Sequence, residues 1–162
     1  MKKIVLTRID DRLIHGQVVT AWLKHLKADA ILIVDNDLAK NTMMARIYKA
    51  AAPSDIELLI KTIEDSITFL KGAAKPQSIF ILTKTPEIIE TLQSAEIVIR
   101  EIILGGMGAN KNRRQLIKNV FASDEERAAM SRMLAGGTRI SYQLVPDDRQ
   151  IKVEKELLEK SK

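Results

Sequence analysis

Short apolar runs alternate with longer amphipathic segments along almost the whole chain. Runs rich in aliphatic and β-branched residues have the length of β-strands at residues 3–7, 30–35, 56–60, 78–83, 101–104 and 139–145. None of them approaches the ~18 to 20 apolar residues that a membrane-spanning helix needs. The hydrophobic pattern therefore predicts a globular chain with about six or seven short strands.

Most segments between these runs have apolar residues at helical spacing. The first helix is predicted over residues 16–26, because Val18, Trp22 and Leu26 fall on one face. Ser123 and Glu126 form a capping-box pattern, so another helix should follow Ser123 and end at the glycines 136–137. The other predicted helices are residues 39–52, 62–70 and 86–95. Two segments are ambiguous, residues 116–121 between a strand and a helical turn, and residues 152–162 between a helix and a frayed tail.

This alternation of strands and helices predicts an α/β fold with an open, doubly wound, mostly parallel sheet and helices on both of its faces. No linker or internal repeat divides the sequence, so residues 1–162 are expected to form a single domain. In such folds ligands bind at the carboxyl ends of the strands, where the strand order reverses. Residues 7–17 lie at the carboxyl end of the first predicted strand.

Composition narrows the classes of function. The sequence has no cysteine, which excludes disulfides, thiolate nucleophiles and cysteine-ligated metal sites. The apolar run after Met1 is far shorter than the ~7 to 15 residues of a signal-peptide core, so we expect an intracellular protein. The net charge of +5 favours nucleic acid, an anionic substrate or an acidic protein as a partner, although a generally solvated surface gives the same excess.

The stretch TRIDDRLIHGQ, residues 7–17, concentrates charge around one histidine. His15 directly precedes the first predicted helix, whose N-terminal N–H groups attract anions, and Arg8 and Arg12 can bind an oxyanion as well. These cations disfavour a protonated imidazole, and neutral imidazole is the nucleophilic form. Asp10 or Asp11 could orient the ring. A plain surface loop with turn-forming aspartates and solvated arginines explains the same residues.

Two related folds lack their central residues here. A phosphoacceptor receiver domain needs an aspartate at the end of its third strand, where this chain has residues 60–62, IKT. A dinucleotide-binding domain needs G-x-G-x-x-G after the first strand, where this chain has acids and arginines. By topology the same edge of the sheet should also carry Asn36, Lys84, Gly105 and Gly106, which are candidates for lining the site. A plain turn is the alternative for the two glycines.

The spacing Arg-x-Asp-Asp-Arg-x-x-His-Gly-Gln of residues 8–17 resembles the phosphohistidine loop of the IIB subunits of one bacterial transport family. That family is the mannose, fructose and sorbose family of the phosphoenolpyruvate-dependent sugar phosphotransferase system. The resemblance continues through residues 33–35, 104–108 and 137–146, and so covers essentially the whole chain.

The resemblance implies that His15 accepts a phosphoryl group through Nδ1 from a phosphohistidine of the IIA subunit. It then passes the group to a sugar carried by the membrane subunits IIC and IID, which makes the chain a cytoplasmic phosphotransferase associated peripherally with the membrane. Arg12 is expected to stabilise the phosphoryl group, Arg8 to supply a second cation and Asp10 to orient the ring; no metal or other cofactor is expected. The rest of the phosphate-binding loop consists of Leu13, Ile14 and Gly16.

Two other functions and several details stay open at this level. Lys111, Arg113 and Arg114 could bind nucleic acid in a non-catalytic module, although no aromatic residues are interleaved with them, and we expect no nucleic-acid partner. The chain could also be a degenerate regulator of the same family. The sequence does not identify the sugar, for which mannose, fructose, sorbose and amino-sugars all remain open. It does not give the oligomeric state either, and it is compatible with a homo-oligomer. Asp11 has no role that follows from its position.

Overall fold

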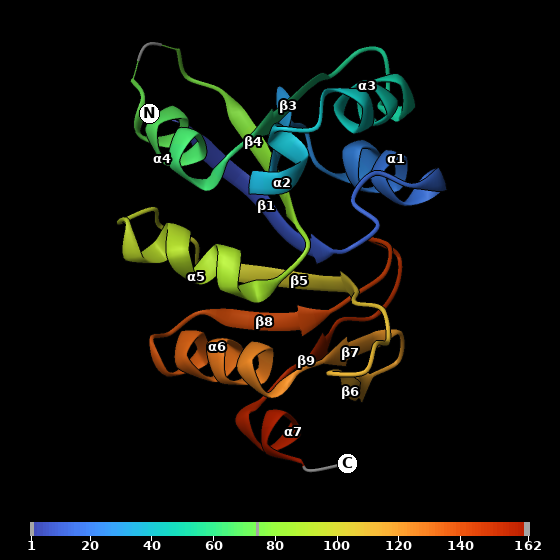
Figure 1. The fold of residues 1–162 in the computed structure, drawn as a ribbon, viewed down its shortest axis with the longest axis vertical. Helices are drawn as coiled ribbons and strands as arrows, with labels where there is room; N and C mark the ends of the chain where they lie inside the picture. Colours follow the sequence, from blue (N-terminus) through green and yellow to red (C-terminus); the bar gives the residue numbers. More distant parts are fainter. Residues whose placement is uncertain (1, 74, 161–162) are drawn as a thin grey trace.

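A central parallel sheet organises the molecule (Figure 1). The computed structural model describes residues 2–73 and 75–160. In that part of the chain the main sheet has seven strands in the order β3-β2-β4-β1-β5-β8-β9, and every pair is parallel except β8 with β9. The strands are β1 (Lys3–Asp10), β2 (Ala30–Val34), β3 (Glu57–Lys61), β4 (Ser78–Thr83), β5 (Glu101–Gly106), β8 (Arg139–Tyr142) and β9 (Ile151–Lys152). The predicted mostly parallel α/β sheet is confirmed.

Helices cover both faces of the sheet (Figure 1). One face carries α1 (Gly16–His25), α2 (Asn36–Ala39) and α3 (Thr42–Ala51), and the other carries α4 (Ile63–Lys71), α5 (Pro86–Ser94) and α6 (Asp124–Ala135). Trp22 of α1 packs in a buried cluster with Ile31 and Phe80, whereas Leu92 of α5 packs in a second cluster with Leu32. Since strand side chains alternate between faces, β2 contributes to both clusters. The fold is therefore doubly wound, as predicted.

The strand order places the end of β1 at the point where the chain changes direction across the sheet. β1 lies between β4 and β5, and the connection through α1 leads toward β2 on one side while β5 and β8 lie on the other. At such a switch point the loops that follow neighbouring strands diverge and leave a crevice at their carboxyl ends. The residues after β1 and β5 are therefore the ones that the fold brings together.

The helix predicted over residues 39–52 is α3, which begins at Thr42, and the short helix α2 before it was not predicted. The Asp35 side chain accepts a hydrogen bond from Leu38 N and starts α2, and Asn41 accepts one from Met44 N and starts α3. The backbone of Asn41 is extended, so it separates α2 from α3. Its side chain supplies the acceptor that the first N–H groups of α3 lack within the helix. The apolar periodicity alone placed the start of α3 too early and did not indicate α2.

One further boundary differs from the prediction, and one ambiguous segment is resolved. The strand predicted over residues 139–145 ends at Tyr142, because the Gln143 side chain bonds to the carbonyl oxygens of Pro146 and Asp148 and folds the chain into a loop. The ambiguous residues 116–121 lie in a small antiparallel hairpin, made of β6 (Arg114–Ile117) and β7 (Val120–Ala122), with Lys118 in the left-handed region at its turn.

The C-terminal tail contains a short helix, α7 (Lys155–Glu159), which packs on α6, and its last residues, 161–162, lie outside the described part. The Ser123 and Glu126 capping box at the start of α6 is present as predicted, with both reciprocal hydrogen bonds. Among the described residues no helix combines the length and apolar character that crossing a membrane requires.

Candidate functional site

The first strand runs further than predicted and carries part of the site itself. β1 continues to Asp10, whereas the hydrophobic pattern ended it at Thr7. Arg8 and Asp10 are therefore strand residues, and at a spacing of two they point to the same face of the sheet. Both are buried, Arg8 with 1% and Asp10 with 0% of its side chain exposed. The hydrophobic pattern missed this extension because buried charged residues look like a loop in sequence.

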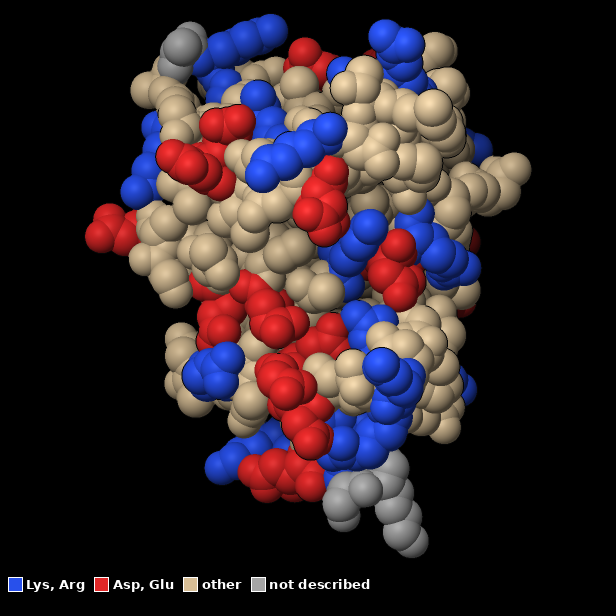
Figure 2. All heavy atoms as spheres, in the orientation of Figure 1, with Lys and Arg blue, Asp and Glu red and all other residues tan. Residues whose placement is uncertain are grey.

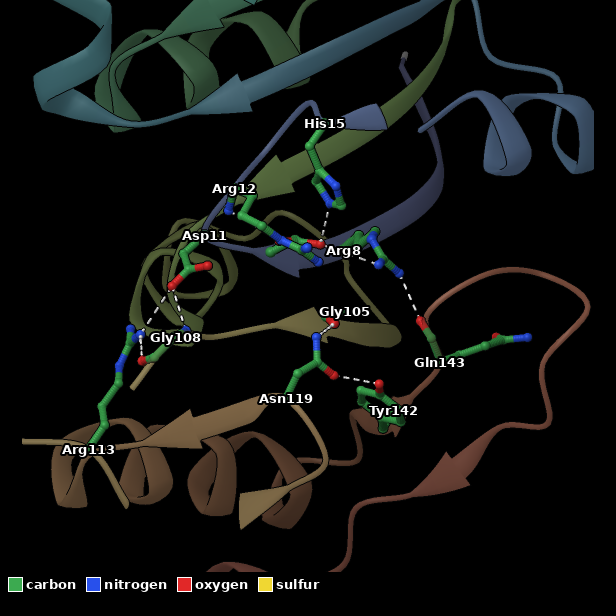
Figure 3. Close-up of polar contacts among 11 residues, drawn as sticks. Arg8, Asp11, Arg12, His15, Gly105, Gly108, Arg113, Asn119, Tyr142 and Gln143 are labelled. Atoms are coloured by element: carbon green, nitrogen blue, oxygen red, sulfur yellow. Dashed lines mark hydrogen bonds and ion pairs between the residues drawn. The ribbon is translucent and has the colours of Figure 1, made fainter. Parts of the chain in front are cut away.

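The Asp10 carboxylate is the centre of the site, because His15, Arg8 and Arg12 all bond to it. Figure 3 shows these three side chains pointing toward one another. Its Oδ2 lies 3.0 Å from His15 Nε2 and 3.4 Å from Arg8 Nη2. Its Oδ1 accepts hydrogen bonds from the backbone N of Arg12 at 3.1 Å and from Arg12 Nε at 3.3 Å. One buried carboxylate thus fixes an imidazole and two guanidinium groups. The sequence left Asp10 and Asp11 open as partners of the imidazole, and the structure pairs the ring with Asp10.

The contact with Asp10 fixes which nitrogen of His15 is free. An ionised carboxylate only accepts hydrogen bonds, so the proton of a neutral imidazole belongs on Nε2. Nδ1 is then left with an unshared electron pair. His15 is the N-cap residue of α1, and 21% of its side chain is exposed. The described geometry therefore presents a nucleophilic nitrogen at a helix N-terminus.

The start of α1 is open to an anion. No side chain caps this helix and no acidic residue occupies its first turn. The first N–H groups of a helix have no partner within the helix and carry partial positive charge. Gly16 adopts φ +47°, a left-handed conformation that favours glycine, and this lets the chain turn from His15 into α1. Backbone donors thus lie next to the imidazole.

Leu13 and Ile14 anchor the loop between Asp10 and His15. Their side chains are buried in the same apolar cluster as Trp22, so only their backbone groups are available to a ligand. Leu13 has φ +56°, which costs a residue with a side chain of the order of 1 kcal/mol. Its amide donates to Asp10 O at 2.8 Å. Apolar packing thus holds a tight turn and fixes the position of His15.

Arg8 lies behind Asp10, away from solvent. Its Nη1 donates to Gln143 O at 2.8 Å, and its Cζ lies 5.5 Å from the centre of the Trp22 ring. Burial lowers the pKa of Arg8, against the opposing attraction of Asp10. A Cβ on Gly105 would overlap with the guanidinium of Arg8, so any larger residue there would displace this buried group. This position lets Arg8 support Asp10, and the expected role of Arg8 as a second phosphoryl cation stays a prediction.

Arg12 is the exposed cation of the site. Half of its side chain, 51%, is exposed, and its Nη atoms have no hydrogen-bond partner within the described residues. A Cβ on Gly106 would lie 3.3 Å from both Arg12 Nη2 and Asp10 Oδ1, which puts the end of β5 directly against the charged group. The expected proximity of Gly105 and Gly106 to the site is therefore found.

Asn36 and Lys84 share the carboxyl edge of the sheet but are engaged elsewhere. The Asn36 Oδ1 accepts a hydrogen bond from Ile63 N at 2.8 Å, next to the start of α4. The ammonium of Lys84 lies 3.8 Å from Asp35 Oδ2. β4 is adjacent to β1 and β2 lies one strand further, so both residues flank the site without contacting the charged group around Asp10.

Asn119 and Tyr142 also approach the site, although neither was predicted as a site residue (Figure 3). The Asn119 Nδ2 donates to Gly105 O at 2.9 Å, and the Tyr142 hydroxyl donates to Asn119 Oδ1 at 2.5 Å. Burial raises the pKa of Tyr142, and the nearby carboxylate of Asp148 raises it further. The only signal for Asn119 was the polar pair at 118–119 between two apolar pairs, typical of a two-residue hairpin turn.

The basic residues considered for nucleic-acid binding are largely paired with acids. Arg113 bonds to Glu126, and Arg114 bonds to Asp124. Figure 2 shows blue and red side chains interspersed on the displayed face, with acidic residues gathered over its lower half. Burial and the carboxylates of Glu126 and Glu125 raise the pKa of Glu87. The pairing of Arg113 and Arg114 with carboxylates does not favour the binding of nucleic acid to this segment.

Other proteins share this sequence and fold. The family described as PTS system sorbose subfamily IIB component matches residues 4–162. The chain is 30% identical to a PTS system fructose-specific EIIB component of Bacillus subtilis (strain 168), with 91% of each covered. It is 28% identical to an N-acetylgalactosamine-specific phosphotransferase enzyme IIB component of Escherichia coli (strain K12), covering 91% of this chain and 94% of the other.

A solved structure agrees with these sequence relatives. The IIBSor domain of the sorbose permease from Klebsiella pneumoniae superposes with a TM-score of 0.93 at 25% identity, covering 99% of this chain and 98% of that one. Sequence match and fold thus extend over the same, nearly complete length. The chain belongs to the sorbose subfamily of IIB components, the phosphocarrier phosphotransferases of the sugar phosphotransferase system.

Proposed function

We propose that His15 carries the phosphoryl group on Nδ1 during sugar phosphorylation. The observation that carries this proposal is the 3.0 Å contact between His15 Nε2 and the buried Asp10, which leaves Nδ1 free at the start of α1. Arg12 supplies an exposed guanidinium that is bonded to the same carboxylate, Asp10. Phosphoryl transfer depends mainly on in-line positioning and on balancing charge at the equatorial oxygens. The site has groups for both tasks.

In the first step the Nδ1 electron pair attacks the phosphorus of a phosphohistidine on the donor. The new N–P bond forms as the donor's N–P bond breaks, and the donor imidazole leaves with the electron pair of that bond. Nε2 keeps its proton, so the phosphorylated ring of His15 becomes cationic. Asp10 stabilises this ring through the same hydrogen bond, and Arg12 with the N–H groups of α1 balances the phosphoryl oxygens.

In the second step a sugar hydroxyl attacks the phosphorus, and the N–P bond to His15 breaks. The imidazole leaves as a neutral base with Nε2 still protonated, and the hydroxyl proton passes to solvent or to a base of the sugar site. Because the cationic ring is a good leaving group, the same Asp10 contact serves both steps. Within this chain the proposal thus uses only the groups around Asp10 and the N–H groups at the start of α1.

Two kinds of partner follow from these steps. The donor is a IIA subunit with its own phosphohistidine, and the acceptor is a sugar held by the membrane subunits IIC and IID. This makes the chain, as a single domain, a cytoplasmic protein that associates peripherally with the membrane through IIC and IID. A PTS system mannose-specific EIIAB component of Escherichia coli (strain K12), 26% identical to this chain, joins an A and a B component by name. This supports a IIA donor.

Incubation with phosphoenolpyruvate and the upstream phosphotransferase proteins tests this function. We expect a single phosphate on each chain, labile in acid and stable in base, as is typical of a phosphorus–nitrogen bond. The label should be lost when sugar and membranes that contain IIC and IID are added. Absence of any label, or a label that resists acid, would overturn the proposal.

Arg12 should matter for transfer and little for folding. An Arg12→Ala variant is expected to slow phosphorylation by about 10²- to 10³-fold, because its exposed guanidinium balances charge that develops in the transition state. Its melting temperature should stay close to that of the wild type. Rapid quench-flow labelling measures the rate of phosphorylation. An Arg100→Ala variant is the control, since Arg100 is exposed and precedes β5 at the opposite edge of the sheet. An undiminished rate for Arg12→Ala would remove Arg12 from the mechanism.

A further inference from the structure

Asp11 points away from the imidazole and toward the loop that follows β5 (Figure 3). Its Oδ2 accepts a hydrogen bond from Gly108 N at 2.7 Å, and its own backbone N donates to Gly106 O at 3.1 Å. Asp11 therefore bonds to this loop on both sides of Met107, whose side chain is buried in the core. Two chain segments almost one hundred residues apart in sequence meet at this one side chain.

Arg113 completes the contact from the opposite side. Its Nη1 lies 3.4 Å from Asp11 Oδ2 and donates to Gly108 O at 3.0 Å. Its Nε and Nη2 donate to the two carboxylate oxygens of Glu126, at 2.8 and 2.6 Å. Only 10% of the Arg113 side chain is exposed, and such a two-bonded pair fixes direction as well as distance. Arg113 therefore holds Asp11 and Gly108 together.

Glu126 is itself fixed by the start of α6. Its Oε1 accepts from Ser123 N at 2.9 Å, while Ser123 Oγ accepts from Glu126 N at 3.1 Å. Burial raises the pKa of Glu126, but hydrogen bonds from Arg113 and Ser123 outweigh it and leave this pKa below its ordinary value. An unbroken set of hydrogen bonds thus runs from the capped end of α6 through Arg113 to the residue next to Asp10.

The loop held in this way continues directly from Gly106, the last residue of β5, which touches the reactive group. A Cβ on Gly106 would lie 3.3 Å from Arg12 Nη2 and from Asp10 Oδ1, so the backbone there has almost no free space beside them. A displacement of the loop would change the room available to Arg12 and to a phosphoryl group. Errors of about 1 Å in such geometry can slow a reaction by about 10²-fold.

We propose that Asp11 and Arg113 form a latch that positions the phosphohistidine loop for transfer. The latch consists of Asp11, Arg113, Glu126 and the backbone of Gly108, and it makes Asp11 and Arg113 positioning residues for the reaction of His15. The inference rests on the proposed function. It gives a role to Asp11 and to the basic segment around Arg113, neither of which takes part in the chemical steps.

The test compares phosphorylation kinetics of Asp11→Ala and Arg113→Met with the wild type, using phosphorylated IIA as the donor. We expect kcat to fall about tenfold or more with KM for the donor unchanged, because the latch orients the loop and does not bind the partner. Asp55→Ala and Arg100→Met are the matched controls. Both residues are exposed and precede a strand, so they lie at the opposite edge of the sheet, and neither variant should change the rate.

Two further measurements separate positioning from general loss of stability. The Gly108 amide should exchange its hydrogen at least about tenfold faster in Asp11→Ala, since its only acceptor in the described structure is Asp11 Oδ2. The Asp11→Asn variant keeps an acceptor for that amide, so it should recover part of the rate. The double variant Asp11→Ala/Arg113→Met should be no slower than the slower single variant, because both residues act through the same contact.

The outcomes distinguish this inference from the proposed function. If the wild type takes no phosphate, the proposed function fails. If the wild type is labelled but the variants keep the wild-type kcat, or change only KM, the latch is refuted. Should Asp11→Ala fail to fold, Asp11→Asn and Arg113→Met decide the matter by the same criteria.

Discussion

Replacing His15 with glutamine is expected to abolish incorporation of phosphate from the phosphorylated donor. Glutamine has no nucleophilic nitrogen, and the only other histidine of the chain, His25, is exposed at the end of α1, where its ring lies edge-on to Trp22. The free energy of unfolding should fall by no more than about 1–2 kcal/mol, because the change removes one hydrogen bond to Asp10 and leaves those from Arg8 and Arg12 in place. Labelling with radioactive phosphoenolpyruvate, followed by mass spectrometry, measures the result.

The matched control is His25→Gln, which should incorporate phosphate at the wild-type rate. A His15→Gln variant that takes up a phosphate of the same acid lability would contradict the proposed role of His15. A His25→Gln variant without label would move the acceptor to the other end of α1. The two variants together therefore assign the acceptor without relying on resemblance.

Replacing Asp10 with alanine should reduce both stability and transfer. The change leaves the guanidinium of Arg8 buried without its carboxylate, and such an unpaired charge costs about 3–5 kcal/mol of the free energy of unfolding. The imidazole of His15 also loses the partner that fixes its proton on Nε2, so phosphorylation should be slower by about 10²-fold or more. Urea denaturation and rapid-quench labelling measure these two effects.

A second variant separates the two effects. Arg8→Met combined with Asp10→Ala removes the uncompensated charge, and we expect it to recover much of the stability that Asp10→Ala loses. It should not recover the rate, because nothing then orients the ring of His15. Recovery of the rate together with stability would show that Asp10 acts only through folding. An Asp10→Ala variant with wild-type stability and rate would contradict the account of the charged group.

The parallel sheet and the start of α6 could be predicted because their signals are local in sequence. Continuous apolar runs indicate buried parallel strands, and the Ser123 and Glu126 pair completes its hydrogen bonds within a single turn. Asn41 was harder, because an asparagine inside an apolar period fits either the middle of one helix or the cap of the next. The helix predicted over residues 39–52 therefore begins three residues too early, because α3 starts after Asn41.

The site was harder to predict because its contacts join distant segments. The residues TRIDDRLIHGQ indicated an anion site, but the pattern did not show that Arg8 is buried under Gly105 and bonded to Gln143 O. That contact spans 135 positions of the sequence. The choice between Asp10 and Asp11 likewise depends on how far β1 extends, and hence on which aspartate faces His15. Pairing across the sheet decides both points, and one sequence carries little information about it.

The most direct test of the central claim is to determine which ring nitrogen of His15 carries the phosphoryl group. Nitrogen and phosphorus NMR of the protein labelled with ¹⁵N-histidine and phosphorylated through phosphoenolpyruvate distinguish the two isomers. The contact between Nε2 and Asp10 predicts that phosphorus is bonded to Nδ1 and that Nε2 keeps its proton. Phosphorus bonded to Nε2 would contradict the account, because that nitrogen could not then donate its hydrogen bond to Asp10.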